Sequence, residues 1–304
     1  MTKSFSEMKK NRSNSLSKLT EQLDKMNTNY SNSSDDDKFW KLSVDKAGNG
    51  RAIIRFLPAT KDEEIPFVRI WDHGFQGPGG WYIENSLTTL GKDDPCSEYN
   101  TKLWNNETED GKKQARKQKR RINYFANILV VEDYANPENN GKVFLFKFGQ
   151  KIFDKLNSAM NPEFEDDLQF NPFDFWEGAD FNLRARNGDN GYRSYDSSRF
   201  ETPNIISDSN GELSEERIEY VWESQYNLQD LLSPENFKSY DELKAKLYKV
   251  LKLTNDDIDI DDDYDKAEPK AQKSKESKAI SRVEEIEEDD DDDLDFFKKL
   301  ANEE

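Results

Sequence analysis

Ten residues in the middle of the sequence carry seven positive charges and no negative charge. The run KKQARKQKRR spans residues 112–121 and is followed closely by Tyr124 and Phe125. Unpaired nucleic acid exposes phosphates and base faces, so a protein that holds it needs cations along a groove and rings for stacking. Binding of this kind weakens with added salt, because each neutralised phosphate releases counterions. A solvated loop is the plainer interpretation of a charge run, and the adjacent rings favour nucleic acid.

A second stretch combines the same two kinds of side chain in a polar setting. The segment NGYRSYDSSRF alternates tyrosine with arginine at Tyr192, Arg193 and Tyr195. A polar loop rarely needs two tyrosines for packing, and the neighbouring arginine suits a phosphate. We therefore expect this stretch to lie at the same surface as the cationic run.

Residues suited to catalysis are scarce. His73 is the single histidine and Cys96 the single cysteine, so acid–base chemistry by histidine depends on one residue and no intramolecular disulfide can form. No phosphate-binding loop, nucleophile-elbow serine or zinc-protease motif occurs. A metal-dependent nuclease would need ordered carboxylates, and the pairs at 93–94 and 166–167 come without a supporting motif. We expect a protein that is not an enzyme.

Charge is distributed unevenly along the 304 residues. Residues 255–304 hold 21 acidic and 8 basic side chains, and so supply 13 of the 19 net negative charges. Residues 1–30 have the opposite balance, with 6 basic and 3 acidic side chains. Such asymmetry indicates nucleic-acid contact combined with an acidic appendage. No apolar run approaches the roughly 18 residues of a membrane helix.

Alternating hydrophobicity predicts the strands that would position these residues. The period-two patterns lie at 51–57, 79–84, 123–131, 142–148 and 179–186. Neighbouring residues of a strand face opposite sides, so one of Tyr124 and Phe125 is expected in the core and the other outside. In the strand at 142–148, Phe146 belongs to a phenylalanine stripe, which usually is core. Short strands with irregular loops and few helices indicate a mainly β fold with a small barrel and insertions.

Helical periodicity is confined to a few segments. Residues 151–160 and two stretches within 212–253 repeat apolar side chains every three or four positions, and Ser239 with Glu242 has the spacing of a capping box. Residues 16–26 have a short apolar helix face, which either packs on its own domain or docks on a neighbouring copy. Residues 256–293 lack apolar periodicity and are expected to be disordered.

Seven segments of the chain carry a resemblance to a known family. They are WKLSVDKAGNGRAIIRFLP (40–58), HGFQGPGGWYIE (73–84), YFANILVV (124–131), PENNGKVF (137–144), FGQKIFDKLN (148–157), FWEGADFNL (175–183) and YDSSRF (195–200). In order and spacing they resemble the single-stranded DNA-binding, or helix-destabilising, protein of T-even-type tailed bacteriophages. The resemblance covers most of residues 38–205. It implies an OB-fold core whose cleft binds single strands without sequence preference.

The resemblance also implies three regions. Residues 1–30 form a basic arm that engages the next protomer, residues 31–254 form the DNA-binding core with its C-terminal helices, and residues 255–304 form an acidic tail. The tail recruits replication, recombination and repair proteins, such as a polymerase, a helicase loader and a recombination mediator, and competes with DNA. The residues expected at the protomer contact are Lys9, Lys10, Arg12, Leu16 and Leu19. Those expected to dock partners are Leu294, Phe296, Phe297 and Leu300.

Residues expected to contact DNA follow from the charge pattern and the resemblance together. For Phe146 the resemblance points to the cleft, whereas the strand pattern points to the core. The set is Lys117, Lys119, Arg120, Arg121, Tyr124, Phe125, Phe146, Lys147, Tyr192, Arg193 and Tyr195.

A structural zinc, which members of this family often hold through one histidine and three cysteines, is not expected here. The matching positions are His73, Ser86, Cys96 and Tyr99. Only two of these are good ligands, and a structural site needs four. We expect no metal and no cofactor, and a region around residues 73–110 held by packing of Trp81, Tyr82, Tyr99 and Trp104.

Together with the charge pattern, the resemblance implies a cooperative, sequence-nonspecific binder that coats single-stranded DNA in the cytoplasm of an infected bacterial host. The alternative is an acidic adaptor or chaperone without a DNA-binding cleft, whose tail does the work.

Overall fold

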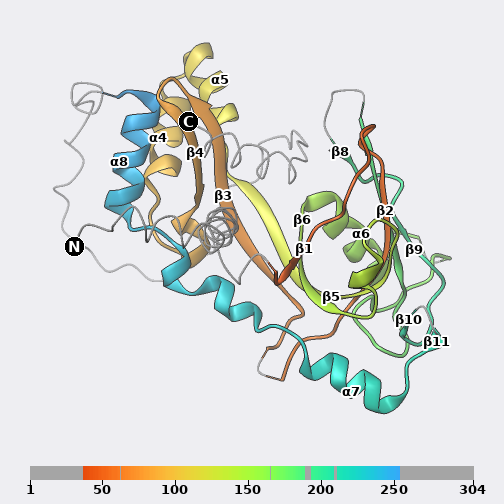
Figure 1. Cartoon of the computed structure of the whole chain (residues 1–304). Helices are drawn as coiled ribbons and strands as arrows, with labels where there is room; N and C mark the ends of the chain where they lie inside the picture. The colour runs from red at the N-terminus through yellow and green to blue at the C-terminus, as the bar shows by residue number, and fades with distance from the viewer. Residues whose placement is uncertain (1–36, 62, 165, 189–192, 209–210, 254–304) are drawn as a thin grey trace, which may run out of the picture. The chain divides into compact units, whose positions relative to one another are not determined.

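The computed structural model describes residues 37–61, 63–164, 166–188, 193–208 and 211–253 (Figure 1). They belong to two units, Met1–Lys41 and Leu42–Glu304, and each unit is described by itself. In the first unit, β1 spans Phe39–Trp40. The predicted arm residues, the predicted tail residues and Tyr192 lie outside the described residues.

The second unit is organised around one long strand. β5 (Arg121–Asp133) pairs on one edge with β6 (Val143–Phe148). On its other edge, β5 pairs first with β3 (Phe67–Gly77) and then with β2 (Gly50–Phe56), all antiparallel (Figure 1). A strand of 13 residues spans roughly 43 Å, which is long enough to serve two partners in succession. The hairpin predicted from residues 123–148 is confirmed.

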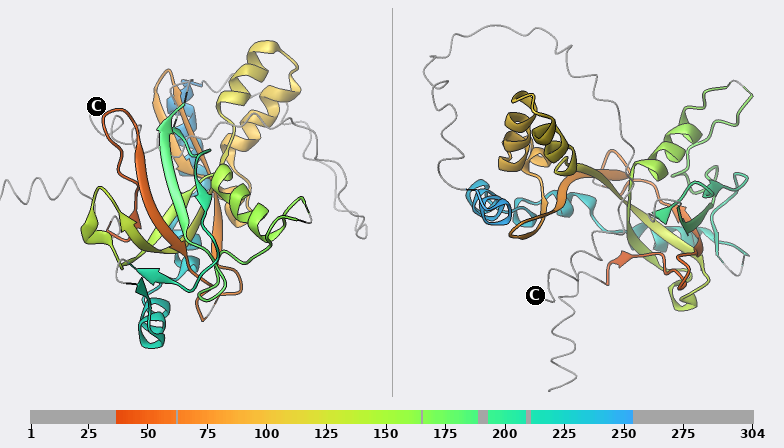
Figure 2. Two further views of the ribbon diagram at one scale, coloured as in Figure 1. Left: turned by 90° about the vertical axis from the view of Figure 1, so that its right-hand side faces the viewer. Right: turned by 90° about the horizontal axis from the view of Figure 1, so that it is seen from above.

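The sheet continues beyond β2. β7 (Phe181–Asn187) pairs with β2, as Figure 2 lets the reader follow, and β7 in turn pairs with β8 (Arg193–Ser194) and β9 (Arg199–Phe200). A short hairpin joins β10 (Ser207–Asp208) to β11 (Gly211–Glu212). The chain is therefore rich in β structure with added helices, as the sequence predicts.

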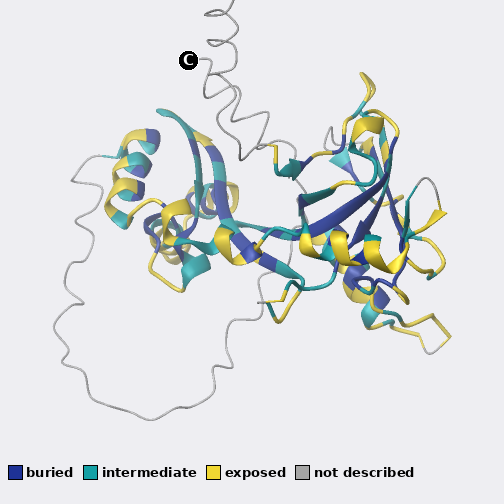
Figure 3. Ribbon diagram, turned by 60° about the horizontal axis from the view of Figure 1, so that its bottom comes forward, coloured by how far each residue is buried: buried dark blue, intermediate teal, exposed yellow. Residues whose placement is uncertain are grey.

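Aromatic rings fill the centre of the sheet. Phe56 is completely buried, and its ring centre lies 5.6 Å from that of Phe148, 5.7 Å from Phe173 and 5.8 Å from Phe181. Pairs at this spacing stabilise a core beyond the area that they bury. Figure 3 shows the buried residues concentrated on the strands.

The β3–β4 hairpin packs on the last described helix. β4 spans Gly80–Asn85 and α8 spans Tyr240–Leu251, which begins with the predicted capping box of Ser239 and Glu242. At the hairpin turn, the Gly79 N–H donates to the Val250 carbonyl at 2.7 Å. A Cβ on Gly79 would lie 2.1 Å from the Lys249 carbonyl oxygen. This close approach requires glycine at position 79, whereas Gly80 is favoured by its positive φ of 116°.

Other helices flank the sheet. α6 (Gln150–Met160) and α7 (Glu215–Glu223) confirm the predicted helical segments. Short 3-10 turns occur at Leu87–Leu90 (η1), Pro137–Asn139 (η2), Leu228–Leu232 (η3) and Pro234–Asn236 (η4). Among the described residues, no helix combines the length and apolar character needed to cross a membrane.

Two further helices occur where none was predicted. α4 spans Pro95–Asn105 and α5 spans Glu109–Lys117, so the first part of the cationic run is helical. Thr108 caps α5 by accepting from the Gly111 N–H. Acidic residues lie in the first turn and basic ones in the last, which the helix dipole favours. These end effects hold a helix that has almost no apolar face of its own.

Candidate nucleic-acid interface

Strand alternation divides the predicted cations and rings between the two faces of β5. Arg121 is opposite Asp72 of β3, and Phe125 is opposite Lys147 of β6. Tyr124 lies an odd number of residues from both Arg121 and Phe125, so its side chain projects to the other face. The run that looks continuous in sequence therefore serves two surfaces.

On the first face, one carboxylate forms ion pairs with two of the predicted cations. Arg121 Nε donates to Asp72 Oδ1 at 3.1 Å, and Lys147 Nζ lies 3.9 Å from Asp72 Oδ2. Asp72 is buried, and the guanidinium of Arg121 lies against Gly74, where a Cβ would come within 2.2 Å of Nη2. Both cations are thus held in place, with their charge partly neutralised.

On the second face, cations gather around an indole ring that the sequence analysis missed. The Arg120 guanidinium lies 4.3 Å from the centre of the Trp71 ring, and Arg69 lies 5.9 Å from it. Arg120 Nη1 also donates to Thr88 Oγ1 at 2.8 Å, which fixes its position. We name Arg69, Trp71 and Arg120 the Trp71 cluster. Within the described part of the chain, neither arginine of the cluster forms an ion pair with a carboxylate.

The Trp71 cluster was missed because β3 was not predicted. Asp72 and His73 interrupt the alternation of FVRIWDHGF, although the cation and the indole stand two residues apart, as on one face of a strand. That spacing is the signal that could have found them.

The helical part of the cationic run adds a second cation–ring pair. Arg116 on α5 lies 5.4 Å from the ring centre of Trp104 on α4. Trp104 is 38% exposed, which corrects the expectation that it packs in the interior. Lys117 at the end of α5 and Lys119 beyond it are also exposed. Cations and rings at this end of the molecule are therefore accessible.

Two predicted stacking rings lie in the core instead. Tyr124 is 4% exposed and Phe146 is 5% exposed. The Tyr124 ring stacks on Phe153 at a centroid distance of 4.0 Å, and its hydroxyl donates to Gln150 Oε1 at 3.0 Å. Burial raises the pKa of Tyr124. Neighbouring side chains already occupy these ring faces, so the strand pattern was the better guide for Phe146.

Phe125 and the described residues Arg193 and Tyr195 of the second predicted stretch are all half-buried. Phe125 is half-buried against the cluster that contains Ile70 and Tyr82. Arg193 lies on β8 opposite Asn187, and Tyr195 follows, half-buried. In the strand order, β2 and β7 stand between β5 and β8. The convergence of the two stretches on one trough stays a prediction.

Two of the four positions matched to a zinc site, His73 and Cys96, lie in one hydrogen-bonded cluster. His73 Nε2 lies 3.3 Å from Asp94 Oδ1, and Nδ1 lies 2.9 Å from the Gln118 carbonyl oxygen and 3.5 Å from Cys96 Sγ. Ser86 instead caps η1. Among the described residues, no group of three or more potential ligands is arranged to hold a metal ion. The residues present do not fit a structural zinc.

The electrostatics of this cluster shift the pKa values of two of its buried groups. Burial alone raises the pKa of Asp94, but the hydrogen bond and charge of His73 outweigh it and hold that pKa well below its usual value. Burial, and next the charge of Asp94, raise the pKa of the Cys96 thiol. Because the Gln118 carbonyl oxygen also accepts from Asn100 Nδ2 at 2.8 Å, the cluster anchors the C-terminal end of α5.

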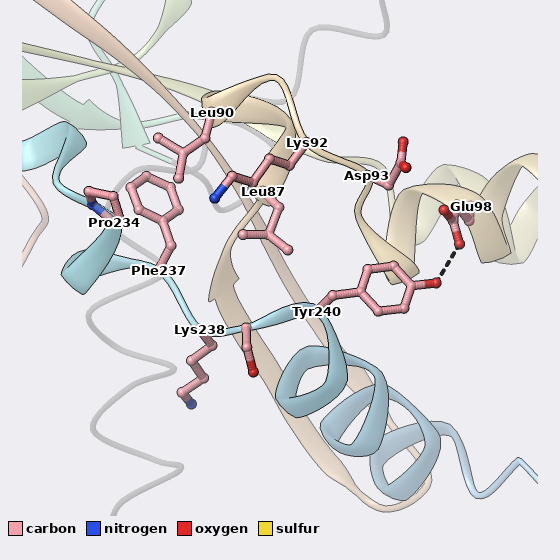
Figure 4. A pocket seen from close by; sticks show the side chains of 10 residues that line it. Leu87, Leu90, Lys92, Asp93, Glu98, Pro234, Phe237, Lys238 and Tyr240 are labelled. Carbon is pink, nitrogen blue, oxygen red and sulfur yellow. Dashed lines mark hydrogen bonds between the residues drawn. The ribbon is translucent and has the colours of Figure 1, made fainter.

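A separate pocket of about 760 Å³ lies between η1, α4 and the start of α8 (Figure 4). Its lining mixes apolar side chains with Lys92 and Lys238 and with the carboxylates of Asp93 and Glu98. The Tyr240 hydroxyl donates to Glu98 Oε2 at 2.6 Å. Carboxylates beside the lysines make this pocket less suited to a polyanion than the Trp71 cluster.

Comparison with known proteins gives a consistent set of relatives. Residues 48–251 match the family model described as gp32 DNA binding protein like. The single-stranded DNA-binding protein of Enterobacteria phage T4 is 39% identical over 244 residues, which are 78% of each chain. That of Enterobacteria phage T2 is 39% identical over 245 residues, with the same coverage. That of Escherichia phage SV14 is 47% identical over 83 residues, 27% of this chain and 74% of the relative.

Proposed function

Because the chain belongs to the gp32 DNA binding protein like family, we propose that it binds single-stranded DNA without sequence preference. It is a binding protein rather than an enzyme. The main structural support for this function is the Trp71 cluster. Two guanidinium groups lie over one indole ring there, near the N-terminal end of β5. Phosphates need the cations and bases need the ring, and the cluster offers both at one place.

The exposed cations next to the cluster extend the interface. Lys117 and Lys119 contact phosphates of the DNA backbone. The guanidinium of Arg120 leaves the Trp71 ring and binds a phosphate instead. Stacking of a base on the indole contributes about 1–3 kcal/mol. Tyr124 and Phe146 act beneath this surface, as the packed core that holds β5 and β6 in register.

We extend the proposal from this interface to the whole chain. A protein that binds only the unpaired form shifts the melting equilibrium of a duplex by mass action. We assign residues 31–254 to an OB-fold core, residues 1–30 to an arm for cooperative contact between protomers, and residues 255–304 to an acidic tail. The tail recruits replication, recombination and repair proteins, in the cytoplasm of an infected bacterial host.

Tryptophan fluorescence tests the proposed function. The full chain, which has six tryptophans, is titrated with a thymidine homopolymer at several salt concentrations. We expect quenching that weakens steeply as salt is added, because counterion release drives the binding. An acidic adaptor would give little quenching at any salt concentration. A nuclease would shorten the polymer when a divalent metal is added.

A further inference from the structure

Three arginines face a common hollow on the β2–β7 part of the sheet. Arg51 and Arg184 are direct partners across the two strands, and Arg186 follows two residues later on the same face of β7. The three line a hollow of about 320 Å³ together with Gly50, Ala185 and Ser197. We name this the arginine hollow.

The arginine hollow is unusual for its lack of counterions. Within the described part of the chain, none of the three guanidinium groups forms an ion pair with a carboxylate, whereas Arg55 and Arg121 each do. The chain has 63 acidic and 44 basic residues, so carboxylates are plentiful. Like charges held together on one face repel each other. An arrangement of this kind is stabilised when an anion binds between them.

A partly exposed ring borders the arginine hollow. The Arg51 guanidinium lies 4.5 Å from the ring centre of Tyr134, which is 46% exposed. Burial and a hydrogen bond with Glu132 raise the pKa of Tyr134, while the charges of Arg51 and Arg184 oppose this. The site offers guanidinium groups beside an aromatic face, the same pairing as in the Trp71 cluster.

The position of the hollow in the sheet indicates its ligand. Arg186 is opposite Ser194 of β8, and Asn187 is opposite Arg193, a predicted DNA contact. A strand of DNA that passes Arg193 would reach the hollow next. The planar fork of arginine matches the oxygens of a phosphate with two parallel hydrogen bonds. We propose that the arginine hollow binds consecutive backbone phosphates of single-stranded DNA, as a second contact region that rests on the proposed function.

The test compares strands of two lengths. The full-length double variant Arg51→Gln/Arg184→Gln is titrated with labelled thymidine strands of about 5 and about 16 nucleotides, which bracket typical site sizes. The control Lys61→Gln/Lys249→Gln removes two exposed cations elsewhere. We expect the long strand to bind about 10-fold more weakly at low salt. Its log–log salt slope should fall by about 1.4, since each phosphate contact contributes about 0.7.

The outcomes separate this inference from the proposed function. We expect the short strand to bind at the Trp71 cluster, and therefore to bind the double variant and the wild type equally. Long-strand binding with the affinity and salt slope of the control overturns the inference, and so does tighter long-strand binding, which would indicate an acidic protein segment as the occupant. If the wild type binds neither strand, the proposed function itself fails. Should the double variant unfold, Arg186→Gln, at an exposed position near the strand end, gives the same comparison with about half the change in slope.

Discussion

The guanidinium of Arg120 lies 4.3 Å over the ring of Trp71, on a strand almost fifty residues earlier in the chain. The hydrogen bond to Thr88 Oγ1 holds the cation there. A cation held over an indole is stabilised by about 0.5–2 kcal/mol, depending on its exposure to water. The pair is thus a stable feature of the free protein.

Substitutions in the Trp71 cluster should weaken DNA binding in two distinguishable ways. Trp71→Ala should cost about 1–3 kcal/mol of binding free energy with little change in salt slope, because it removes stacking. Arg120→Gln should reduce the salt slope by about 0.7, because it removes one phosphate contact. Fluorescence anisotropy of a labelled strand measures both, with Lys249→Gln as control. Wild-type behaviour of both variants would exclude the cluster from the interface.

Phe146→Leu should affect stability rather than DNA binding. The ring is buried against Phe148 and Phe56, so a smaller side chain should lower the free energy of unfolding by about 1–2 kcal/mol. DNA affinity should change less than about twofold, well below the effect of losing a stacking ring. Urea unfolding and anisotropy provide the two readings. A large loss of DNA affinity with unchanged stability would contradict this prediction and show that Phe146 contacts DNA.

Asp94→Asn should destabilise the protein. It replaces one oxygen of a buried carboxylate that contacts His73 Nε2 at 3.3 Å, and a lost hydrogen-bond partner of this kind costs about 1–3 kcal/mol. The folded-state pKa of Asp94 lies below its unfolded value of 3.8. Its contribution is therefore complete above pH 3.8 and is lost as the pH falls below that value. Urea unfolding above and below pH 3.8 measures the free energy of unfolding of both proteins. The difference between wild type and variant should shrink as the pH falls.

The exposed neighbour Asp93 provides the matched control, since Asp93→Asn removes the same charge outside the cluster. Equal effects of the two substitutions at neutral pH would refute a specific His73–Asp94 interaction.

Metal chelation should leave the fold unchanged. His73 on β3 already contacts Asp94 and Cys96 at the start of α4, so no metal is needed to join β3 to α4. Dialysis against EDTA should not alter the melting temperature, and added zinc should not raise it. A melting temperature that falls on dialysis and recovers with zinc would show a metal-dependent fold.

Deletion of residues 255–304 should raise the apparent affinity for DNA, most strongly at low salt. A tethered polyanion has a high effective concentration near the cationic surface and competes with the strand. Anisotropy titrations of the full and shortened chains at several salt concentrations test this. Equal affinities at low ionic strength would remove the competition.

Local patterns in the sequence were enough to predict much of the fold. The strands β2, β5, β6 and β7, the capped start of α8 and the resemblance to the phage family all follow from side chains close together in the chain. Hydrophobic alternation and helix caps are short-range effects, so sequence alone carries them. β3 and α4 were not predicted because polar residues interrupt the hydrophobic periodicity of both segments.

Only the tertiary structure decided which cations and rings meet. Residues 120–125 are continuous in sequence, yet Arg120 contacts Trp71, Arg121 pairs with Asp72 and Tyr124 lies in the core. The face of a strand that is buried depends on the strands beside it and the helices above it, which come from distant parts of the chain. The composition of the cationic run predicted a binding surface, and the neighbours supplied by β3, β6 and α6 determined which of its residues belong to that surface.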